Sequence, residues 1–203
     1  MITFKKYFTE SVGKRAVIAY GRYNPPTIGH EALVNKVREV SAREDADGFI
    51  IPTHSHDNKK NPLTFKEKAS ILNKMIEGNS NVVILEEGKT LISLLQHLQS
   101  RGYTHIIHIA GSDRIPEFEG LVGRYNNTPD TKGNIPFAFR DYQFESSGDR
   151  DPDSEGVEGM SASKLRQLAI DGNVEEFKQG MSDRVDDLQK EETFNIIRER
   201  LTK

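Results

Sequence analysis

The chain contains no cysteine. Disulfide bonds, thiol nucleophiles and zinc–thiolate centres are therefore excluded, and the composition is compatible with a reducing cytoplasm. No apolar run approaches the roughly 18 residues of a membrane span. The amino-terminal stretch MITFKKYFTESVGKR also lacks the apolar core of a secretion signal. These absences predict a cytoplasmic protein with no membrane partner.

Charge of either sign is not in large excess, since Lys and Arg number 28, Asp and Glu 31, and the formal net charge is -3. This near-neutral balance argues against a general nucleic-acid binder, which needs a net positive surface. With 203 residues, the chain is long enough for one good core and short for two domains. Hydrophobic residues at 35% and charged residues at 29% indicate a globular protein with a heavily charged surface.

Short apolar runs alternate with amphipathic stretches along most of the chain. The runs predicted as strands are Arg15–Tyr20, Gly48–Pro52, Asn81–Leu85, Thr104–Ala110 and Pro136–Phe144. The stretches predicted as helices are Glu31–Val40, Phe65–Ile76, Thr90–Arg101, Ser161–Ile170, Val174–Gln179 and Asp183–Leu201. This alternation predicts an α/β fold, a Rossmann-like, doubly wound parallel sheet with a C-terminal helical extension. Ligands of such sheets bind beyond the carboxyl ends of the strands, so functional residues are expected there.

The first strand end carries the loop GRYNPPTIGH, Gly21–His30. Its prolines stiffen the backbone, and its glycines let the backbone bend where a Cβ would obstruct. The loop ends at a predicted helix start, where free amides and the helix dipole favour an anion. Thr27 and His30 lie one turn apart and can both face that anion. Spacing alone supports a phosphate site and a plain stiff turn equally.

This loop resembles the HIGH-type signature, (H/T)-x-G-H after a G-x-x-x-P turn, of the adenylyltransferase and cytidylyltransferase superfamily. The sequence of the loop is similar to that of archaeal-type nicotinamide-mononucleotide adenylyltransferases. Thr27 departs from that subgroup, which usually has histidine at this position. Threonine is instead typical of pantetheine-phosphate adenylyltransferases and of eukaryotic-type nicotinamide-mononucleotide enzymes, so the subgroup stays open.

A second stretch, MSASKLR, opens the helix predicted near the C-terminus, and Ser161 or Ser163 would cap that helix. It resembles the superfamily's second signature, I-S-S-T-x-I-R, with matches at Ser161, Ser163 and Arg166 and a departure at Ala162. In the family this element grips the triphosphate tail of the donor. The sequence of this stretch is also similar to that of phage-encoded nucleotidyltransferases, which would act in the cytoplasm of the host.

The stretch KKNPLTFKEK follows the second predicted strand and resembles the N-P-F-T motif of archaeal-type enzymes and the K-K-P-x-F-T motif of pantetheine-phosphate enzymes. Thr64 is expected to cap the next helix, with Glu67 completing a capping box. Lys59 and Lys60 stand where a lysine can approach the transferring phosphates, although adjacent lysines in a loop are more often merely solvated.

The stretch Gly111-Ser112-Asp113 ends the fourth predicted strand. It resembles the G-x-D of nicotinamide-mononucleotide enzymes, where the aspartate helps to hold the acceptor nucleotide. A carboxylate at a strand end can accept hydrogen bonds from ribose hydroxyls. Asp113 could equally cap a short helix that follows, and the two roles are compatible.

The resemblance implies that an acceptor phosphate attacks the α-phosphate of a nucleoside triphosphate in line, with pyrophosphate leaving and no covalent enzyme intermediate. The residues expected at the donor phosphates and the transition state are His30, Thr27, Lys60 and Arg166. Those expected to shape or bind the nucleotide are Gly21, Arg22, Asn24, Gly29, Ser161 and Ser163. Those expected at the acceptor are Gly111 and Asp113. Mg²⁺ is expected, held mainly by triphosphate oxygens and water, with no metal-ligating residue of the protein.

Transfer of AMP from ATP to a small phosphorylated acceptor, first of all nicotinamide mononucleotide, is the expected reaction. Cytidylyl transfer, a pantetheine-phosphate acceptor, and a non-catalytic nucleotide-binding or assembly protein of the same fold are the alternatives. A nucleic-acid ligase or synthetase fragment shares the HIGH-type loop, but the chain lacks room for its further domains.

The expected organisation is an N-terminal extension over residues 1–14, a nucleotidyltransferase domain over 15–172, and a helical segment over 173–203 that packs on it. The acidic segment Glu145–Gly159 is expected to be a mobile loop, either a lid over the site or a linker. The apolar stripe of the last helix could pack on its own chain or on a neighbour, which leaves a homo-oligomer open.

Overall fold

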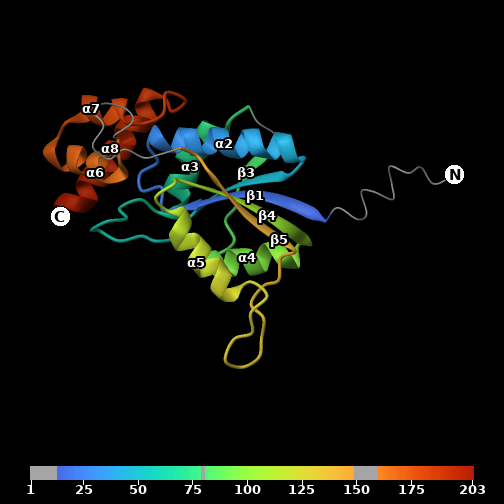
Figure 1. The fold of residues 1–203 in the computed structure, drawn as a ribbon. Coiled ribbons are helices and arrows are strands. Elements are labelled where there is room, and N and C mark those ends of the chain that lie inside the picture. Colours follow the sequence, from blue (N-terminus) through green and yellow to red (C-terminus); the bar gives the residue numbers. More distant parts are fainter. Residues whose placement is uncertain (1–12, 79–80, 149–159) are drawn as a thin grey trace.

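The computed structural model describes residues 13–78, 81–148 and 160–203 (Figure 1). Its centre is a five-stranded parallel sheet in the order β3-β2-β1-β4-β5. The strands are β1 Lys14–Gly21, β2 Asp47–Pro52, β3 Val82–Ile84, β4 Tyr103–Ala110 and β5 Asp141–Ser146. The helices are α2 Gly29–Glu44, α3 Phe65–Ile76, α4 Leu91–Ser100, α5 Ile115–Tyr125, α6 Ala162–Asp171, α7 Val174–Gln179 and α8 Asp187–Thr202. The expected Rossmann-like fold with C-terminal helices is thereby confirmed.

Helices cover both faces of the sheet. Val17 and Ala19 of β1 lie in one buried cluster with α2 and α3, whereas Ala16 and Ile18 lie in a second with α4 and α5. Successive side chains of a strand point to opposite faces. Because both faces are covered, β1 is an unbroken apolar run rather than an alternating one.

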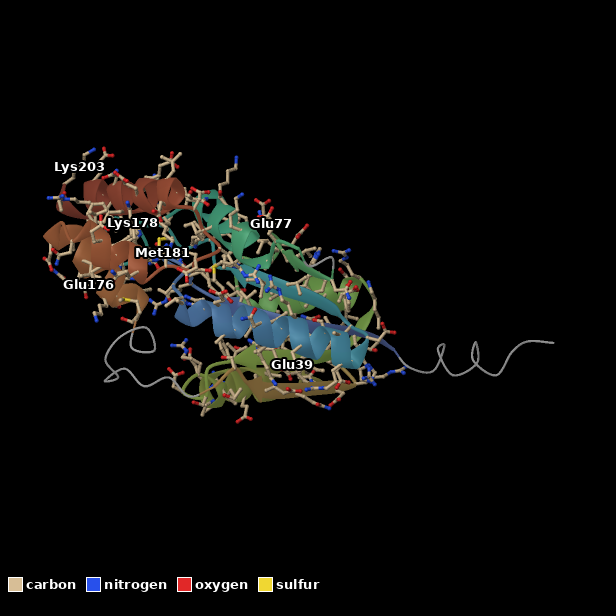
Figure 2. The ribbon with its side chains drawn as sticks, turned by 90° about the horizontal axis from the view of Figure 1, so that it is seen from above. Glu39, Glu77, Glu176, Lys178, Met181 and Lys203 are labelled. Atoms are coloured by element: carbon tan, nitrogen blue, oxygen red, sulfur yellow. The ribbon has the colours of Figure 1, made fainter. Side chains whose placement is uncertain are left out.

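The C-terminal helices α6, α7 and α8 gather beyond the carboxyl end of β1 (Figure 1). Seen from above, they lie beyond the amino-terminal end of α2, with Glu176 and Lys178 marking α7 (Figure 2). Phe194 of α8 packs edge-on against Phe177 of α7 at a ring-centroid distance of 5.4 Å, and Ile197 is fully buried. The apolar stripe of α8 therefore packs on its own chain.

The structure corrects the expected position of the fifth strand, which pairs with β4 over Asp141–Ser146 rather than Pro136–Phe144. Phe137 and Phe139 are buried without belonging to a named strand, because they pack in the α4 and α5 layer. Their apolar character reflects that packing and not a sheet ladder. Glu145 and Ser146, expected in a loop, end β5, and residues 149–159 of that predicted loop lie outside the described residues.

The structure also corrects the start of the last helix and the expected cap of the helix after β4. The last helix begins after Asp186, whose side chain accepts a hydrogen bond from the backbone N–H of Gln189, and not at Asp183. The helix after β4 begins after Arg114, with no side-chain cap, so the expectation that Asp113 caps it is wrong. By contrast, α3 has the predicted bounds and the predicted capping box of Thr64 and Glu67.

Gly48 of β2 provides a test of the sheet packing. A Cβ built on it would lie 2.6 Å from the Ser41 hydroxyl, 2.9 Å from a Val82 methyl and 3.0 Å from the Asn81 carbonyl oxygen. We expect Gly48→Ala to lower the free energy of unfolding by about 1–3 kcal/mol through overpacking. Gly120→Ala is the control, because a Cβ there meets nothing within 4 Å and should add about 0.5–1 kcal/mol. Chemical denaturation measures both, and equal midpoints would contradict this packing.

His108 of β4 is a fully buried imidazole. Its Nδ1 lies 3.0 Å from the Tyr142 hydroxyl, and its ring packs against Phe118 of α5 and Phe144 of β5. Burial in these apolar surroundings lowers the pKa of His108 to about 3.

Acid should therefore destabilise the protein through His108. Below its ordinary pKa of about 6.5, the unfolded chain binds a proton that the folded chain refuses until about pH 3. Between these values, stability should fall by about 1.4 kcal/mol per pH unit from this group alone. The double variant His108→Phe, Tyr142→Phe should show a shallower decline when unfolding is measured from pH 7 to pH 4. Equal slopes for the two proteins would contradict the account.

Candidate active site

The predicted motifs meet at the carboxyl ends of β1, β2 and β4. The strand order reverses between β1 and β4, which is the usual ligand position in a doubly wound sheet. The loop Gly21–His30 follows β1, and Gly111 follows β4. The C-terminal helices stand at the same end (Figure 1).

The loop after β1 is held in an uncommon backbone conformation. Tyr23 has a φ of 47° and is buried, with its hydroxyl donating to the Ala19 carbonyl oxygen. The bond between Asn24 and Pro25 is cis. The Asn24 amide donates to the Leu63 carbonyl oxygen and accepts from the Leu63 N–H, both at 2.9 Å. Asn24 therefore shapes the loop by fastening it to the segment before α3.

Thr27 fixes the ring of His30. The backbone N–H of Thr27 donates to Nδ1 of His30 at 2.9 Å, and the Thr27 hydroxyl lies 2.9 Å from the same nitrogen. A backbone N–H can only donate, so Nδ1 must accept. We therefore assign the neutral tautomer that carries its proton on Nε2. The Tyr23 ring packs against the imidazole at a centroid distance of 4.9 Å.

The amino-terminal ends of α2 and α6 lie side by side. A Cβ built on Gly29, the first residue of α2, would be 3.7 Å from the carbonyl oxygen of Met160, just before α6. Helix α2 has no side-chain cap, whereas Ser161 caps α6 by accepting from the Lys164 N–H, as predicted. Two helix starts, with their amides and dipoles, therefore face one region.

Arg166 joins the two signatures directly. Its guanidinium donates to the Asn24 carbonyl oxygen at 2.7 Å and to the Ser163 hydroxyl at 3.0 Å. Partial burial lowers the pKa of Arg166 and the nearby positive charge of Arg22 lowers it further, while Asp57 opposes them. The guanidinium stays charged because its ordinary pKa is so high. The two arginines thus concentrate positive charge at this end of the sheet.

Lys60 lies in a turn organised by Asp57. The Asp57 carboxylate accepts from the backbone N–H groups of Lys59, Lys60 and Asn61. A hydrogen bond from the Asn61 side chain, followed by those from the Lys60 and Lys59 amides, holds the pKa of Asp57 well below its ordinary value. The turn backbone is thereby fixed, and Lys60 is exposed at the rim of the site.

The C-terminal helix braces the same segment from its other end. Arg200 of α8 donates to the Pro62 carbonyl oxygen at 2.6 Å and to both oxygens of the Glu67 carboxylate at 2.7 and 2.9 Å. Glu67 also accepts from the Thr64 N–H in the capping box. Helix α8 therefore contributes to the position of the segment that carries Lys60.

Asp113 lies at the rim beyond β4. A Cβ built on Gly111 would be only 2.7 Å from an Asp113 carboxylate oxygen, so the glycine permits this close approach. The Gly111 carbonyl oxygen accepts from the Arg114 N–H at 2.9 Å, which closes the turn. Asp113 is exposed and can accept hydrogen bonds from a ligand.

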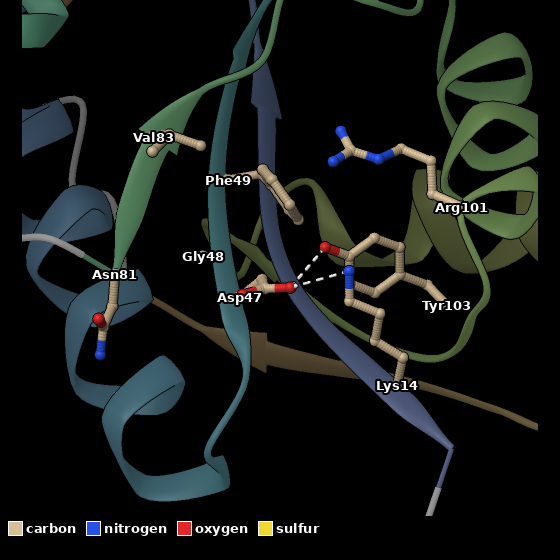
Figure 3. A pocket seen from close by; sticks show the side chains of 8 residues that line it. All are labelled: Lys14, Asp47, Gly48, Phe49, Asn81, Val83, Arg101 and Tyr103. Atoms are coloured by element: carbon tan, nitrogen blue, oxygen red, sulfur yellow. Dashed lines mark hydrogen bonds and ion pairs between the residues drawn. The ribbon is translucent and has the colours of Figure 1, made fainter.

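A cavity of about 210 Å³ lies at the opposite end of the sheet (Figure 3). Its polar lining comes from strand beginnings, where the Tyr103 hydroxyl donates to Asp47 at 2.5 Å and the Lys14 ammonium lies 3.3 Å from the same carboxylate. These groups pair with one another, and the cavity contains none of the motif residues. It is therefore separate from the candidate active site.

Comparison with known families decides the class of protein. The model of the cytidylyltransferase-like family matches residues 18–168. The chain belongs to this family. It is therefore a nucleotidyltransferase, as the two signatures predicted. None of the helices in the described ranges combines the length and the apolar content that a membrane crossing requires.

The individual proteins to which this chain is similar are named as adenylyltransferases of nicotinate mononucleotide. A probable nicotinate-nucleotide adenylyltransferase of Acholeplasma laidlawii is 27% identical over 133 residues, which is 60% of this chain and 70% of the relative. The nicotinic acid mononucleotide adenylyltransferase of Plasmodium falciparum, solved in complex with NaAD, has a TM-score of 0.59 at 15% identity. This match covers 90% of this chain and 98% of that one. Its complex with APC gives a TM-score of 0.57, also at 15% identity, with 90% of this chain and 98% of that one covered. At this identity the two structures show the fold alone.

In this nucleotidyltransferase, the structure places the predicted residues in two groups. The inner group comprises Asn24, Thr27, Gly29, His30, Ser163 and Arg166. Hydrogen bonds join Thr27 to His30 and Arg166 to Asn24 and Ser163, and Gly29 lies beside Thr27. The outer group comprises the exposed residues Arg22, Lys60 and Asp113, with the glycines Gly21 and Gly111, at the end of β1 and in the loops that follow β1, β2 and β4. Ser161 is near the inner group, but its hydroxyl serves as a helix cap.

Sequence reasoning did not single out Asp57, Arg200 or Lys68. Asp57 had a weak signal, since an aspartate before a turn often binds the following amides. No local sequence signal marked Arg200, because its partner Glu67 lies 133 residues earlier in the chain. Lys68 did have a clear sequence signal, because it falls on the apolar stripe of its helix at the spacing of Ile71, Leu72 and Met75.

Proposed function

We propose that the chain transfers AMP from ATP to a pyridine mononucleotide, nicotinate or nicotinamide mononucleotide, with release of pyrophosphate. The observation that carries this proposal is the bond from Arg166 to the Asn24 carbonyl oxygen, which holds the second signature against the first. The names of the relatives in Acholeplasma and Plasmodium support the acceptor class.

His30 and Arg166 would stabilise the transition state. The acceptor phosphate oxygen attacks the α-phosphorus, the bond from that phosphorus to the bridging oxygen breaks, and pyrophosphate leaves with the electron pair. Nε2–H of His30 would donate to an α-phosphate oxygen, with Thr27 holding the ring in that tautomer. Arg166 and Lys60 would offset the charge that moves to the leaving group. Such fixed donors act without reorganising during the reaction.

The remaining residues would bind and orient the substrates. Amides at the starts of α2 and α6, with Gly29, Ser161 and Ser163, would hold the phosphate tail. Gly21, Arg22 and Asn24 would shape the loop against the nucleotide. Gly111 leaves room for Asp113, whose carboxylate would accept from ribose hydroxyls of the acceptor.

A magnesium ion fits this site as a companion of the nucleotide. Within the described ranges, no group of three or more histidine, cysteine, aspartate or glutamate residues could hold a metal ion. A cation coordinated mainly by triphosphate oxygens and water needs no such group. When bound, it would supply charge neutralisation on the phosphates.

Product analysis tests the proposal. Purified protein is incubated with ATP or CTP and with nicotinate mononucleotide, nicotinamide mononucleotide or pantetheine phosphate. Pyrophosphate release and adduct mass are then recorded. We expect release with ATP and a pyridine mononucleotide. Release only with CTP or only with pantetheine phosphate would support the other enzyme readings, and ATP binding without release would support a non-catalytic protein.

A further inference from the structure

Lys68 of α3 is fully buried, on the same helix stripe as Leu72 and Met75. Its ammonium donates to the Thr53 carbonyl oxygen and, at 3.5 Å, to the Ser55 carbonyl oxygen, just beyond the end of β2. Within residues 13–78, 81–148 and 160–203, no carboxylate forms an ion pair with it. A methionine or leucine at this position would pack equally well on the apolar helix face, so packing does not explain why the side chain is charged.

The charged groups around Lys68 have other partners. Glu67, its neighbour on α3, is bound by Arg200 of α8. In the loop after β2, Asp57 binds the backbone amides of its turn, and His54 contacts the Glu86 carbonyl oxygen and stacks on Phe65. Burying an ammonium without a counter-charge is costly. Accordingly, burial lowers the pKa of Lys68 to about 8.

Through Thr53, this ammonium is connected to the start of the HIGH-type loop, Gly21–His30. The backbone of Thr53 makes two hydrogen bonds: its carbonyl oxygen accepts from Lys68, and its N–H donates to the Gly21 carbonyl oxygen at 2.8 Å. Gly21 is the first residue of the HIGH-type loop. The buried Thr53 hydroxyl has no hydrogen-bond partner among the described residues. Thr53, just beyond the end of β2, therefore carries both the carbonyl that Lys68 contacts and a buried hydroxyl without a partner among the described residues.

We propose that Lys68 is a positioning residue whose buried charge is balanced by the phosphates of the bound nucleotide, so that nucleotide binding and protonation of Lys68 favour each other. This inference rests on the proposed function. It differs from a role in holding the loop alone, because a neutral amine still has hydrogens to donate to Thr53 and Ser55. Only the coupling of charge predicts proton uptake on binding, and linkage makes that coupling reciprocal.

Calorimetry of ATP binding tests the coupling. Titrations at pH 8 in buffers of different ionisation enthalpy give the number of protons taken up. We expect the wild-type protein to take up about half a proton, because a group with a pKa near 8 is about half protonated there. Lys68→Gln keeps a hydrogen-bond donor and removes the charge. It should take up none at this pH and bind ATP about fivefold more weakly, which is what a rise of one pKa unit on binding gives for a group that starts half protonated.

Lys66→Met is the matched control, because Lys66 is exposed on the same helix and should leave proton uptake unchanged. Carbon-13 NMR of labelled lysine in the wild-type protein gives a second measurement that needs no folded variant. One lysine should titrate near pH 8 in the free protein and higher with ATP. Equal proton uptake by the wild type and Lys68→Gln, or a midpoint that ATP does not move, would overturn this inference alone. Absence of ATP binding by the wild type would overturn the proposed function as well.

Discussion

Replacement of His30 by alanine should lower turnover by about 10²- to 10³-fold, the usual loss when one preorganised donor to a developing charge is removed. Because Thr27 donates to Nδ1, the Nε2 proton of the imidazole is the one that the proposed mechanism directs to the phosphate, and alanine has no such donor. The fold should persist, since His30 is only partly buried at the start of α2. Steady-state pyrophosphate release measures turnover, and circular dichroism checks the fold.

His97→Ala is the matched control for this experiment. His97 is also half-buried, but it lies on α4, which packs on the opposite face of the sheet from α2. We expect its turnover to match the wild type. If His30→Ala and His97→Ala both kept full turnover, His30 would have no part in the transition state.

Arg166→Met should cost about 10²-fold in kcat/KM for ATP. The change removes a positive charge from the proposed phosphate site, and charge-assisted hydrogen bonds contribute about 1.5–3 kcal/mol each. It also removes the bond to the Asn24 carbonyl oxygen that holds the first loop against α6. Lys164→Ala is the control, because Lys164 is exposed on the same helix and only pairs with Glu176 at 3.8 Å.

Arg166→Lys separates charge from geometry. Arginine donates from one nitrogen to Asn24 and from another to Ser163, a spread that a single ammonium cannot reproduce. We expect the lysine variant to recover only part of the lost kcat/KM. Full recovery would show that charge alone matters, and it would contradict the role assigned to the bridge between the two signatures.

The fold was largely predictable because the local signals agree with the packing. The apolar run of β1 is unbroken since both of its faces are covered. Helix α3 could be located to the residue, because the Thr64 and Glu67 capping box marks its start. The fifth strand was misplaced because Phe137 and Phe139 carry the apolar signal, whereas the strand itself, DYQFES, lies at the polar edge of the sheet.

The site was predictable as a set of loops but not as a network. The motifs and the rule for parallel sheets indicate which strand ends matter. They do not indicate that Arg166 binds a carbonyl oxygen 142 residues earlier in the chain, because that contact depends on where the C-terminal helices dock. Likewise, the position of Lys68 on an apolar stripe was visible in the sequence, but the end point of its ammonium was not.

Hydrogen exchange with and without ATP tests most directly whether the starts of α2 and α6 grip one polyphosphate. Amides in the first turn of a helix do not donate to a carbonyl oxygen four residues earlier within the helix. Those without another acceptor exchange readily unless a ligand binds them. The N–H groups of His30, Glu31 and Lys164 already donate to Thr27, Ile28 and Ser161. Saturating ATP should therefore slow exchange at Gly29 in α2 and at Ala162 and Ser163 in α6, while the first turn of α4 stays unchanged. Slowing at only one of the two starts, or at neither, in protein saturated with ATP would contradict the account.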